Sequence, residues 1–206
     1  MKPRGYIMAR RKDHTRPELK DFIRHEAEKI IKTKGFDHLT ARALAARIGY
    51  SSGTIYNIYP DMDALKQDIN SHTLEHLYDA CAVVLESPLK GQAQLQSLAY
   101  TYLDFAQKNK PLWSLLFLNE RTGSENVSKE YQKLLSKIFF LIETALAQNI
   151  PHQTSSLKRT ARLLWACLHG ITVLTLDGRL KLIGETNSQN LIKELITPFL
   201  KNQKTK

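Results

Sequence analysis

The chain has 206 residues, a length that suits one large domain or a small domain joined to a larger one. Hydrophobic residues make up 42% of it, and its 9 glycines and 7 prolines are few, which excludes disordered, collagen-like and low-complexity proteins. The 30 Lys and Arg outnumber the 20 Asp and Glu, and residues 1–60 carry 13 of the basic residues against 6 acidic ones. A basic N-terminal part on a nearly neutral remainder is typical of a nucleic-acid-binding module.

The sequence begins with a basic segment and an amphipathic helix. We interpret residues 1–14 as a basic arm, the alternative for their first part being a solvated tail; the cations of the arm next to the helix are Arg10, Arg11 and Lys12. Apolar residues at i, i+3 and i+4 spacing predict a helix that begins after Thr15 and ends at Gly35. Thr15 and Glu18 have the spacing of a capping box, and glycine is favoured just beyond a last turn.

Two short helices follow, with the layout of a helix-turn-helix. Thr40 is a candidate cap for the first of them, and Gly49 supplies the turn between the two. Ser51 or Ser52 then caps a third helix that runs to about Tyr59. In such a motif the second short helix enters a DNA major groove, which is about 12 Å wide. The candidate core residues of the pair are Leu44, Ile48 and Ile55.

The rest of the chain continues the helical pattern, with expected helices at 65–85, 92–108, 111–119, 126–148, 154–176 and 187–201. The fold class is therefore all-α, with about nine helices: a three-helix helix-turn-helix head and a larger C-terminal bundle. We place the head at 15–62 and the bundle at 63–206. The longest apolar run has 14 residues, too short for a membrane span, so we expect a cytoplasmic protein with no membrane partner.

Two stretches resemble a known family. GFDHLTARALAARIGYSSGTIYNIYPDMDAL, from Gly35 to Leu65, resembles the DNA-binding head of the TetR family of bacterial regulators, in its Leu-Thr, its Ala-x-x-Ile-Gly turn, its Gly-Thr-Ile-Tyr and its Ala-Leu. This resemblance covers roughly residues 15–70. Further on, RLLWACLHGITVL resembles a Trp-x-x-x-His-Gly signature in the ligand domain of one branch of the family, matched by Trp165, His169 and Gly170.

The resemblance implies contacts of the head with double-stranded DNA. Arg42 matches a position that often reaches a base edge, where arginine can pair bidentately with guanine. The other residues that the resemblance places on bases are Ser52, Gly53 and Asn57, and those that it places on phosphates are Thr40, Thr54 and Tyr56. Three alternatives stay open, namely a cap without DNA contact for Thr40, a packing role for Tyr56 and a solvated side chain for Asn57.

Two positions depart from the family pattern. The family often has a histidine at the position of Ile58 and a lysine at that of Met62, both used on phosphate. We expect the arm to compensate by placing Arg10, Arg11 and Lys12 in a minor groove. The same departures are the support for a protein that has lost DNA binding, and a non-specific architectural DNA binder is a further alternative.

The resemblance also implies a dimeric regulator, a repressor rather than an activator. A homodimer presents two heads about 34 Å apart and binds an inverted repeat. The last two helices are implied to form the dimer interface, and an intrachain core is the alternative for their apolar seams. The seam of the first helix is Leu157, Ala161, Leu164, Leu168 and Ile171, and that of the second is Leu191, Leu195, Ile196, Phe199 and Leu200.

The bundle is implied to hold a small apolar or amphipathic effector that releases the repressor. Most aromatic residues at helical spacing pack in cores, but a few are expected to line a cavity. Our candidates are Trp113, Phe117, Trp165 and His169. Gly170, beside His169, would allow a neighbouring helix to pack closely.

Motifs for other chemistry are scarce. We find no nucleophile, phosphate-binding or dinucleotide-binding motif, so we expect neither an enzyme nor a cofactor. Cys81 and Cys167 fall in apolar stretches and are expected to be buried thiols. His72 and His76 belong to an H-x-x-E-H motif, which leaves a regulatory metal or ligand site as an alternative to solvated or packed histidines.

Overall fold

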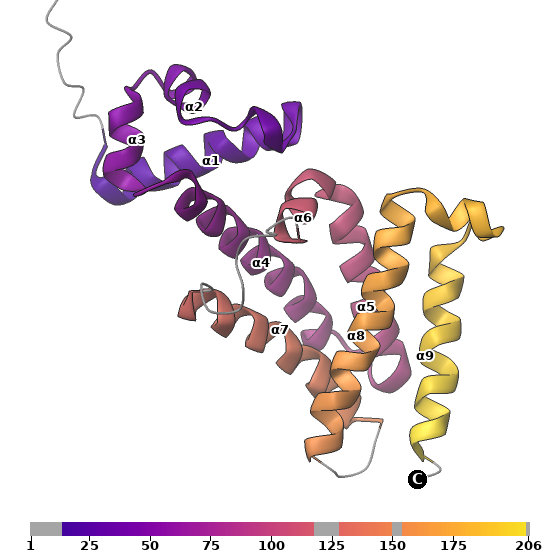
Figure 1. Ribbon diagram of the computed structural model, residues 1–206. Helices are drawn as coiled ribbons and strands as arrows, with labels where there is room; N and C mark the ends of the chain where they lie inside the picture. Colours follow the sequence, from indigo (N-terminus) through magenta and orange to yellow (C-terminus); the bar gives the residue numbers. More distant parts are fainter. Residues whose placement is uncertain (1–13, 118–127, 150–153, 205–206) are drawn as a thin grey trace, which may run out of the picture. The chain divides into compact units, whose positions relative to one another are not determined.

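The computed structural model describes residues 14–117, 128–149 and 154–204. Within these ranges the regular elements are nine α-helices and two short 3-10 segments (Figure 1), which confirms the all-α class expected from the sequence. Their packing forms two compact units, Met1–Asp68 and Ile69–Lys206. This division falls within one helix, and the boundary that the sequence places after residue 62 stays a prediction.

The first helix of the first unit, α1 (Arg16–Lys34), forms where its capping residues predict it. The Thr15 backbone N–H donates to the Glu18 carboxylate at 2.7 Å, and the Thr15 hydroxyl oxygen accepts from the Glu18 N–H, which completes the capping box. Gly35 follows the last turn with φ 90°, a conformation that favours glycine. A short 3-10 segment that the sequence did not predict, η1 (Phe36–His38), leads to the next helix.

The helix-turn-helix consists of α2 (Ala41–Ile48) and α3 (Ser52–Ile58). Gly49 lies between them with φ 72°, in the left-handed region that the tight turn requires. Of the two serines that the sequence offers as a cap for α3, Ser51 is the one used, and its hydroxyl accepts from the Thr54 N–H at 3.2 Å. The core residues predicted for this pair, Leu44, Ile48 and Ile55, are all buried.

The longest helix, α4 (Met62–Glu86), follows directly after Asp61, whose carboxylate accepts the Ala64 N–H at 2.7 Å. Its residues up to Asp68 belong to the first unit and the others to the second. The remaining elements are α5 (Gly91–Lys108), α6 (Lys110–Phe117), α7 (Lys129–Ala147), α8 (Thr154–Leu176), η3 (Arg179–Ile183) and α9 (Ser188–Lys204). In the second unit α8 packs against both α7 and α9, and α5 packs against all three (Figure 1).

The second unit corrects two expectations. Cys81 is buried, but Cys167 is exposed, because it lies to the side of the α8 face formed by the buried Ala161, Leu164 and Leu168. For the predicted dimer seams the alternative holds, since most of these side chains pack in the chain's own core, among them Ala161, Leu164, Leu168, Ile196 and Leu200. The side chain of Phe199 lies outside the described residues.

The helices can be compared with the expectation that the chain has no membrane span. In the described part of the chain, none of them combines the length and the hydropathy that crossing a membrane requires. The helices are instead amphipathic or short, as their buried faces indicate.

Candidate nucleic-acid interface and apolar cavity

All seven head residues that the resemblance assigns to DNA lie at the surface of α2, α3 or their caps. Thr40, Arg42, Gly53, Tyr56 and Asn57 are exposed, and Ser52 and Thr54 are half-buried. Tyr56 keeps 49% of its surface exposed, which speaks against a packing role within this unit. The structure therefore brings the seven together on two consecutive short helices and leaves each of them accessible.

The two threonines keep donor capacity for a phosphate oxygen. The Thr40 hydroxyl oxygen accepts the Ala43 N–H at 3.1 Å, and this cap leaves its O–H hydrogen available. Thr54 lies beside the α3 cap, with its hydroxyl 3.1 Å from that of Ser51. A hydroxyl can thus cap a helix and contact DNA at once, so capping does not exclude the contact expected of Thr40.

The two arginines of α2 differ in their partners. Arg47 forms an ion pair with Glu26 of α1 through its Nε, 2.5 Å from the carboxylate, and Lys29 contacts the other oxygen of Glu26 at 2.7 Å. The hydrogen bond from Lys29 lowers the pKa of Glu26 against the effect of burial, and Arg47 adds to it. Among the described residues Arg42 has no such partner, so its guanidinium is available to DNA.

The orientation of α3 depends on a cluster of charged and polar side chains that the sequence did not reveal. Tyr59, which ends α3 and is buried, donates its hydroxyl hydrogen to Asp68 of α4 at 2.7 Å. Lys20 and Arg24 of α1 pair with the two oxygens of the same carboxylate at 2.8 and 3.3 Å. Asp68 therefore links α1, the end of α3 and the start of α4 (the Asp68 cluster).

Burial and charge have opposite effects on the pKa of Asp68 and the same effect on the pKa of Tyr59. Burial on its own would raise the pKa of Asp68, but the hydrogen bonds from Lys20 and Tyr59 and the charges of Lys20 and Arg24 lower it below its ordinary value. Burial and the neighbouring carboxylate raise the pKa of Tyr59, which keeps its hydroxyl protonated as a donor. The cluster is thus an ionised carboxylate with three donors around it.

His14, the last residue of the basic arm, lies beside the turn of the motif. Arg10, Arg11 and Lys12 lie outside the described residues. His14, directly after them, stacks on Phe22 with ring centroids 5.3 Å apart, and its Nδ1 lies 3.1 Å from the hydroxyl of Tyr50. Tyr50 belongs to the turn between α2 and α3, so His14 lies next to the helix-turn-helix.

In the second unit the four effector candidates lie together. His169 of α8 stacks on Trp165 at 5.1 Å between ring centroids and contacts Phe117 of α6 at 4.4 Å. Trp113 lies 5.2 Å from Phe117 and 6.0 Å from His169. The aromatic cluster of these four residues joins α6 and α8, and its members on the two helices are about 50 positions apart in sequence.

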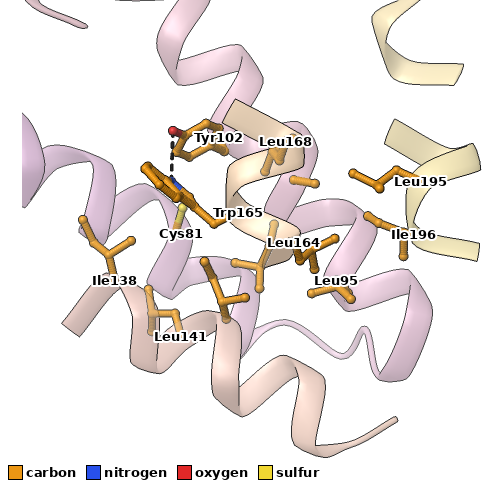
Figure 2. A pocket seen from close by; sticks show the side chains of 13 residues that line it. Cys81, Leu95, Tyr102, Ile138, Leu141, Leu164, Trp165, Leu168, Leu195 and Ile196 are labelled. Atoms are coloured by element: carbon orange, nitrogen blue, oxygen red, sulfur yellow. Dashed lines mark hydrogen bonds between the residues drawn. The ribbon is translucent and has the colours of Figure 1, made fainter. Parts of the chain in front are cut away.

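An apolar cavity of about 40 Å³ adjoins this cluster (Figure 2). Of the four candidates only Trp165 lines it, together with residues of α4, α5, α7, α8 and α9 that include Cys81, Leu95, Tyr102, Ile138, Leu164 and Ile196. Burial raises the pKa of the Cys81 thiol to about 12, so this sulfur is uncharged. The cavity therefore has no charged group in its lining.

The polar atoms beside the cavity satisfy one another. The indole N–H of Trp165, which can only donate, lies 3.2 Å from the Tyr102 hydroxyl oxygen (Figure 2). The Tyr102 hydroxyl also lies 3.0 Å from Nδ1 of His169, and it donates to this nitrogen when the imidazole is neutral and carries its proton on Nε2. Burial also lowers the pKa of His169, and this favours the same neutral form.

Comparison with known proteins identifies the family. Residues 95–198, about half of the chain, match the model of the tetracyclin repressor-like C-terminal domain, and residues 23–69 match that of bacterial regulatory proteins of the tetR family. The chain belongs to the TetR family. It is accordingly a DNA-binding transcriptional regulator of the helix-turn-helix type.

Two known proteins are similar to the chain over about two thirds or more of their length. The chain is 26% identical over 151 residues, 72% of its length, to an uncharacterized HTH-type transcriptional regulator, YobS of Bacillus subtilis (strain 168), and covers 74% of it. It is 21% identical over 133 residues, 65% of its length, to the nucleoid occlusion factor SlmA of Marinobacter nauticus (strain ATCC 700491 / DSM 11845 / VT8), and covers 67% of it.

Solved structures share the TetR fold. A protein of unknown function from Rhodococcus sp. RHA1 superposes with a TM-score of 0.77 at 20% identity, over 95% of this chain and 99% of that one. The TetR-family regulator PfmR from Thermus thermophilus gives 0.63 at 16% identity, over 87% and 97%. At these identities the likeness shows the fold alone.

The outward face of α8 carries a row of exposed residues that the Trp-x-x-x-His-Gly signature did not predict. Leu163, Cys167, Gly170 and Leu174 follow one another at spacings of four, three and four, and all are exposed, Leu163 by 56%. A Cβ built on Gly170 meets nothing within 4 Å, so among the residues that the structure describes none packs closely against this glycine. We call these four residues the α8 stripe.

Proposed function

We propose that this TetR-family regulator is a cytoplasmic homodimeric repressor that binds an inverted-repeat operator and leaves it when a small effector binds. The observation that carries the proposal is the accessible surface of α2 and α3. It presents seven residues suited to DNA, and the opposite side of these helices packs on the rest of the unit. Ile55 is fully buried beneath this surface, and the Asp68 cluster holds the end of α3. An enzyme function has no comparable support in these residues.

We assign the DNA contacts by chemistry. Arg42, Ser52, Gly53 and Asn57 contact base edges, because arginine and asparagine pair with bases and glycine permits close approach. Thr40, Thr54 and Tyr56 donate hydroxyl hydrogens to phosphates. Ile58 and Met62, which replace phosphate-contacting residues of the family, are half-buried and contribute packing instead. The arm residues Arg10, Arg11 and Lys12 supply the missing cationic contacts.

The α8 stripe forms the centre of the dimer interface. Exposed aliphatic side chains at helical spacing are the pattern of a helix that packs on a partner, and a glycine with open space around it lets a second helix approach. The buried seam residues that the sequence suggested serve the core of each chain. Dimerisation through α8 and α9 therefore uses a different face of α8 from the one predicted.

The effector enters the apolar cavity. A cavity of about 40 Å³ is smaller than the ~150 Å³ that holds benzene in an engineered protein core, so the effector must displace lining side chains. The uncharged lining and the mutually satisfied Tyr102, Trp165 and His169 favour an uncharged, apolar molecule. Because Leu164, Leu168 and Ile196 of α8 and α9 line the cavity, its expansion shifts the helices that carry the dimer interface.

The experiment that tests the proposal is selection of bound duplexes from a random DNA pool by the full-length chain at near-physiological salt. We expect enrichment of an inverted repeat whose half-sites lie one helical turn apart. Enrichment of a single half-site would contradict the dimer. Absence of any enriched sequence, with binding that disappears as salt rises, would replace the proposal by an architectural DNA binder.

A further inference from the structure

The H-x-x-E-H motif of α4 takes no part in the proposed DNA, dimer or effector contacts. The helix places His72 and His76 four residues apart on one face. Their Nε2 atoms lie 3.2 Å apart, and the two rings meet edge to face with centroids at 4.3 Å and an interplanar angle of 75°. The two Nε2 atoms, either of which can bind a metal, therefore lie next to each other on one face of the helix.

The separation of the two nitrogens matches a metal chelate. Two imidazole nitrogens bound about 2.0–2.1 Å from a tetrahedral ion lie about 3.3–3.4 Å apart, close to the 3.2 Å observed. Each ring then carries its proton on Nδ1 and directs the Nε2 lone pair at the metal. Binding replaces one N–H···N hydrogen bond by two metal–nitrogen bonds, and the proton moves between ring nitrogens without net release.

The surroundings favour a cation. Glu75 and Asp79, both exposed, lie on the same part of α4 and bring negative charge to the pair. In the described ranges no third His, Cys, Asp or Glu stands close enough to complete a ligand set, so water fills the other coordination positions. Imidazole ligands with water suit zinc, nickel and copper, whereas magnesium and calcium require oxygen ligands.

We propose that His72 and His76 form a two-histidine site for a divalent transition-metal ion of the zinc, nickel and copper class. The site lies in α4, on residues of the second unit, and its ligands are independent of the DNA-contacting residues of α2 and α3. It stands or falls separately from the proposed repressor function.

The test is isothermal titration of the full-length chain, freed of any histidine tag, with Ni²⁺ in a non-coordinating buffer near pH 7.5. His72→Gln and His76→Gln remove one ligand each. His25→Gln is the matched control, since His25 is also an exposed histidine of a long helix, α1. Far-UV circular dichroism verifies that each variant is folded, and Mg²⁺ replaces Ni²⁺ in a parallel titration.

The proposal predicts one Ni²⁺ per chain and no Mg²⁺ binding. Each of His72→Gln and His76→Gln weakens the Ni²⁺ site by at least about tenfold, since loss of even an outer-shell partner typically costs 10–100-fold. His25→Gln leaves it unchanged. Equal Ni²⁺ affinity in the wild type and both variants, or no binding at all, would show that the pair is only hydrogen-bonded and would overturn the proposal.

Discussion

The helix-turn-helix unit and the cavity of the helical bundle are built from different interactions. In the first unit, α3 is fixed by an ionised carboxylate with three donors around it, and both short helices have side-chain caps. In the second, the cavity is enclosed by aliphatic and aromatic side chains, and the polar atoms of Tyr102 and Trp165 hydrogen-bond to each other and, from Tyr102, to the neighbouring His169. Directional bonds hold a recognition surface in one geometry, whereas an apolar lining can repack around a guest.

The largest effect is expected from breaking the Asp68 cluster. Asp68→Ala removes one of the two carboxylates that contact Arg24, whose side chain is 18% exposed. It also removes the partner of Lys20 and the nearer of the two acceptors of the Tyr59 hydroxyl. We expect the free energy of unfolding of the first unit to fall by about 3 kcal/mol, measured by hydrogen exchange of the amides of α1–α3. The matched control is Asp104→Ala, which removes an exposed pair with Lys108 and should cost under about 1 kcal/mol.

The same cluster gives the first unit a pH dependence. Because the folded-state pKa of Asp68 is lowered, its contribution is complete above the ordinary carboxyl pKa near 4 and is lost as pH falls through the lower folded value. Asp68→Asn should remove this part of the acid sensitivity. An identical acid profile in the variant and the wild type would contradict the role given to the cluster.

The second-largest effect is expected at the α8 stripe, which lies on the outer surface of the bundle and not in its core. Leu163→Glu places a carboxylate on the proposed two-fold interface and should weaken the dimer by about 100-fold, or about 2–3 kcal/mol, in analytical ultracentrifugation. Val83→Glu is the control, since Val83 of α4 is 65% exposed and lies outside the stripe. A dimer that survives Leu163→Glu would place the interface elsewhere.

A smaller and more selective effect is expected for the two arginines of α2. Arg42→Ala should cost about 1–3 kcal/mol of operator binding and relax the preference at one base pair per half-site, measured on a set of single-substitution operators. Arg47→Ala should instead act through the loss of its bond to Glu26, without changing base preference. If Arg42→Ala weakened every duplex equally, Arg42 would be a phosphate contact.

The smallest predicted effect lies in the bundle. Burial lowers the pKa of His169, so the unfolded chain binds the proton more readily, and stability falls as pH drops below the ordinary value near 6.5. Thermal unfolding at pH 7.5 and 5.5 should show a loss of under about 1 kcal/mol in the wild type that His169→Gln reduces. The exposed His38 provides the control variant, His38→Gln, which should retain the full loss.

The contrast between the two units also explains what the sequence could predict. Caps and turns are local, so Thr15 with Glu18, Thr40 and Gly49 revealed the helices of the head and their ends. The Asp68 cluster joins residues up to 48 positions apart, and no local pattern announces such a contact. In the bundle, helical periodicity located the helices but not their outer faces, which is why Cys167 was expected to be buried and is exposed.

For the effector site, the sequence predicted residues that lie near the cavity, but it did not predict the residues that line it. Aromatic composition pointed to Trp113, Phe117, Trp165 and His169, and these residues do cluster in the structure. The cavity itself is lined mainly by aliphatic residues that look like any other core positions. Only the packing of five helices shows that they leave a space between them.

The most direct test of the account compares two duplexes of equal length and base composition. One carries the selected inverted repeat and the other a scrambled sequence, and the affinity of the full-length chain is measured for both at near-physiological salt. A sequence-specific regulator predicts tighter binding to the repeat by ~10³-fold or more. Affinities within about tenfold of each other, with the same steep salt dependence, would contradict specific recognition by the surface of α2 and α3.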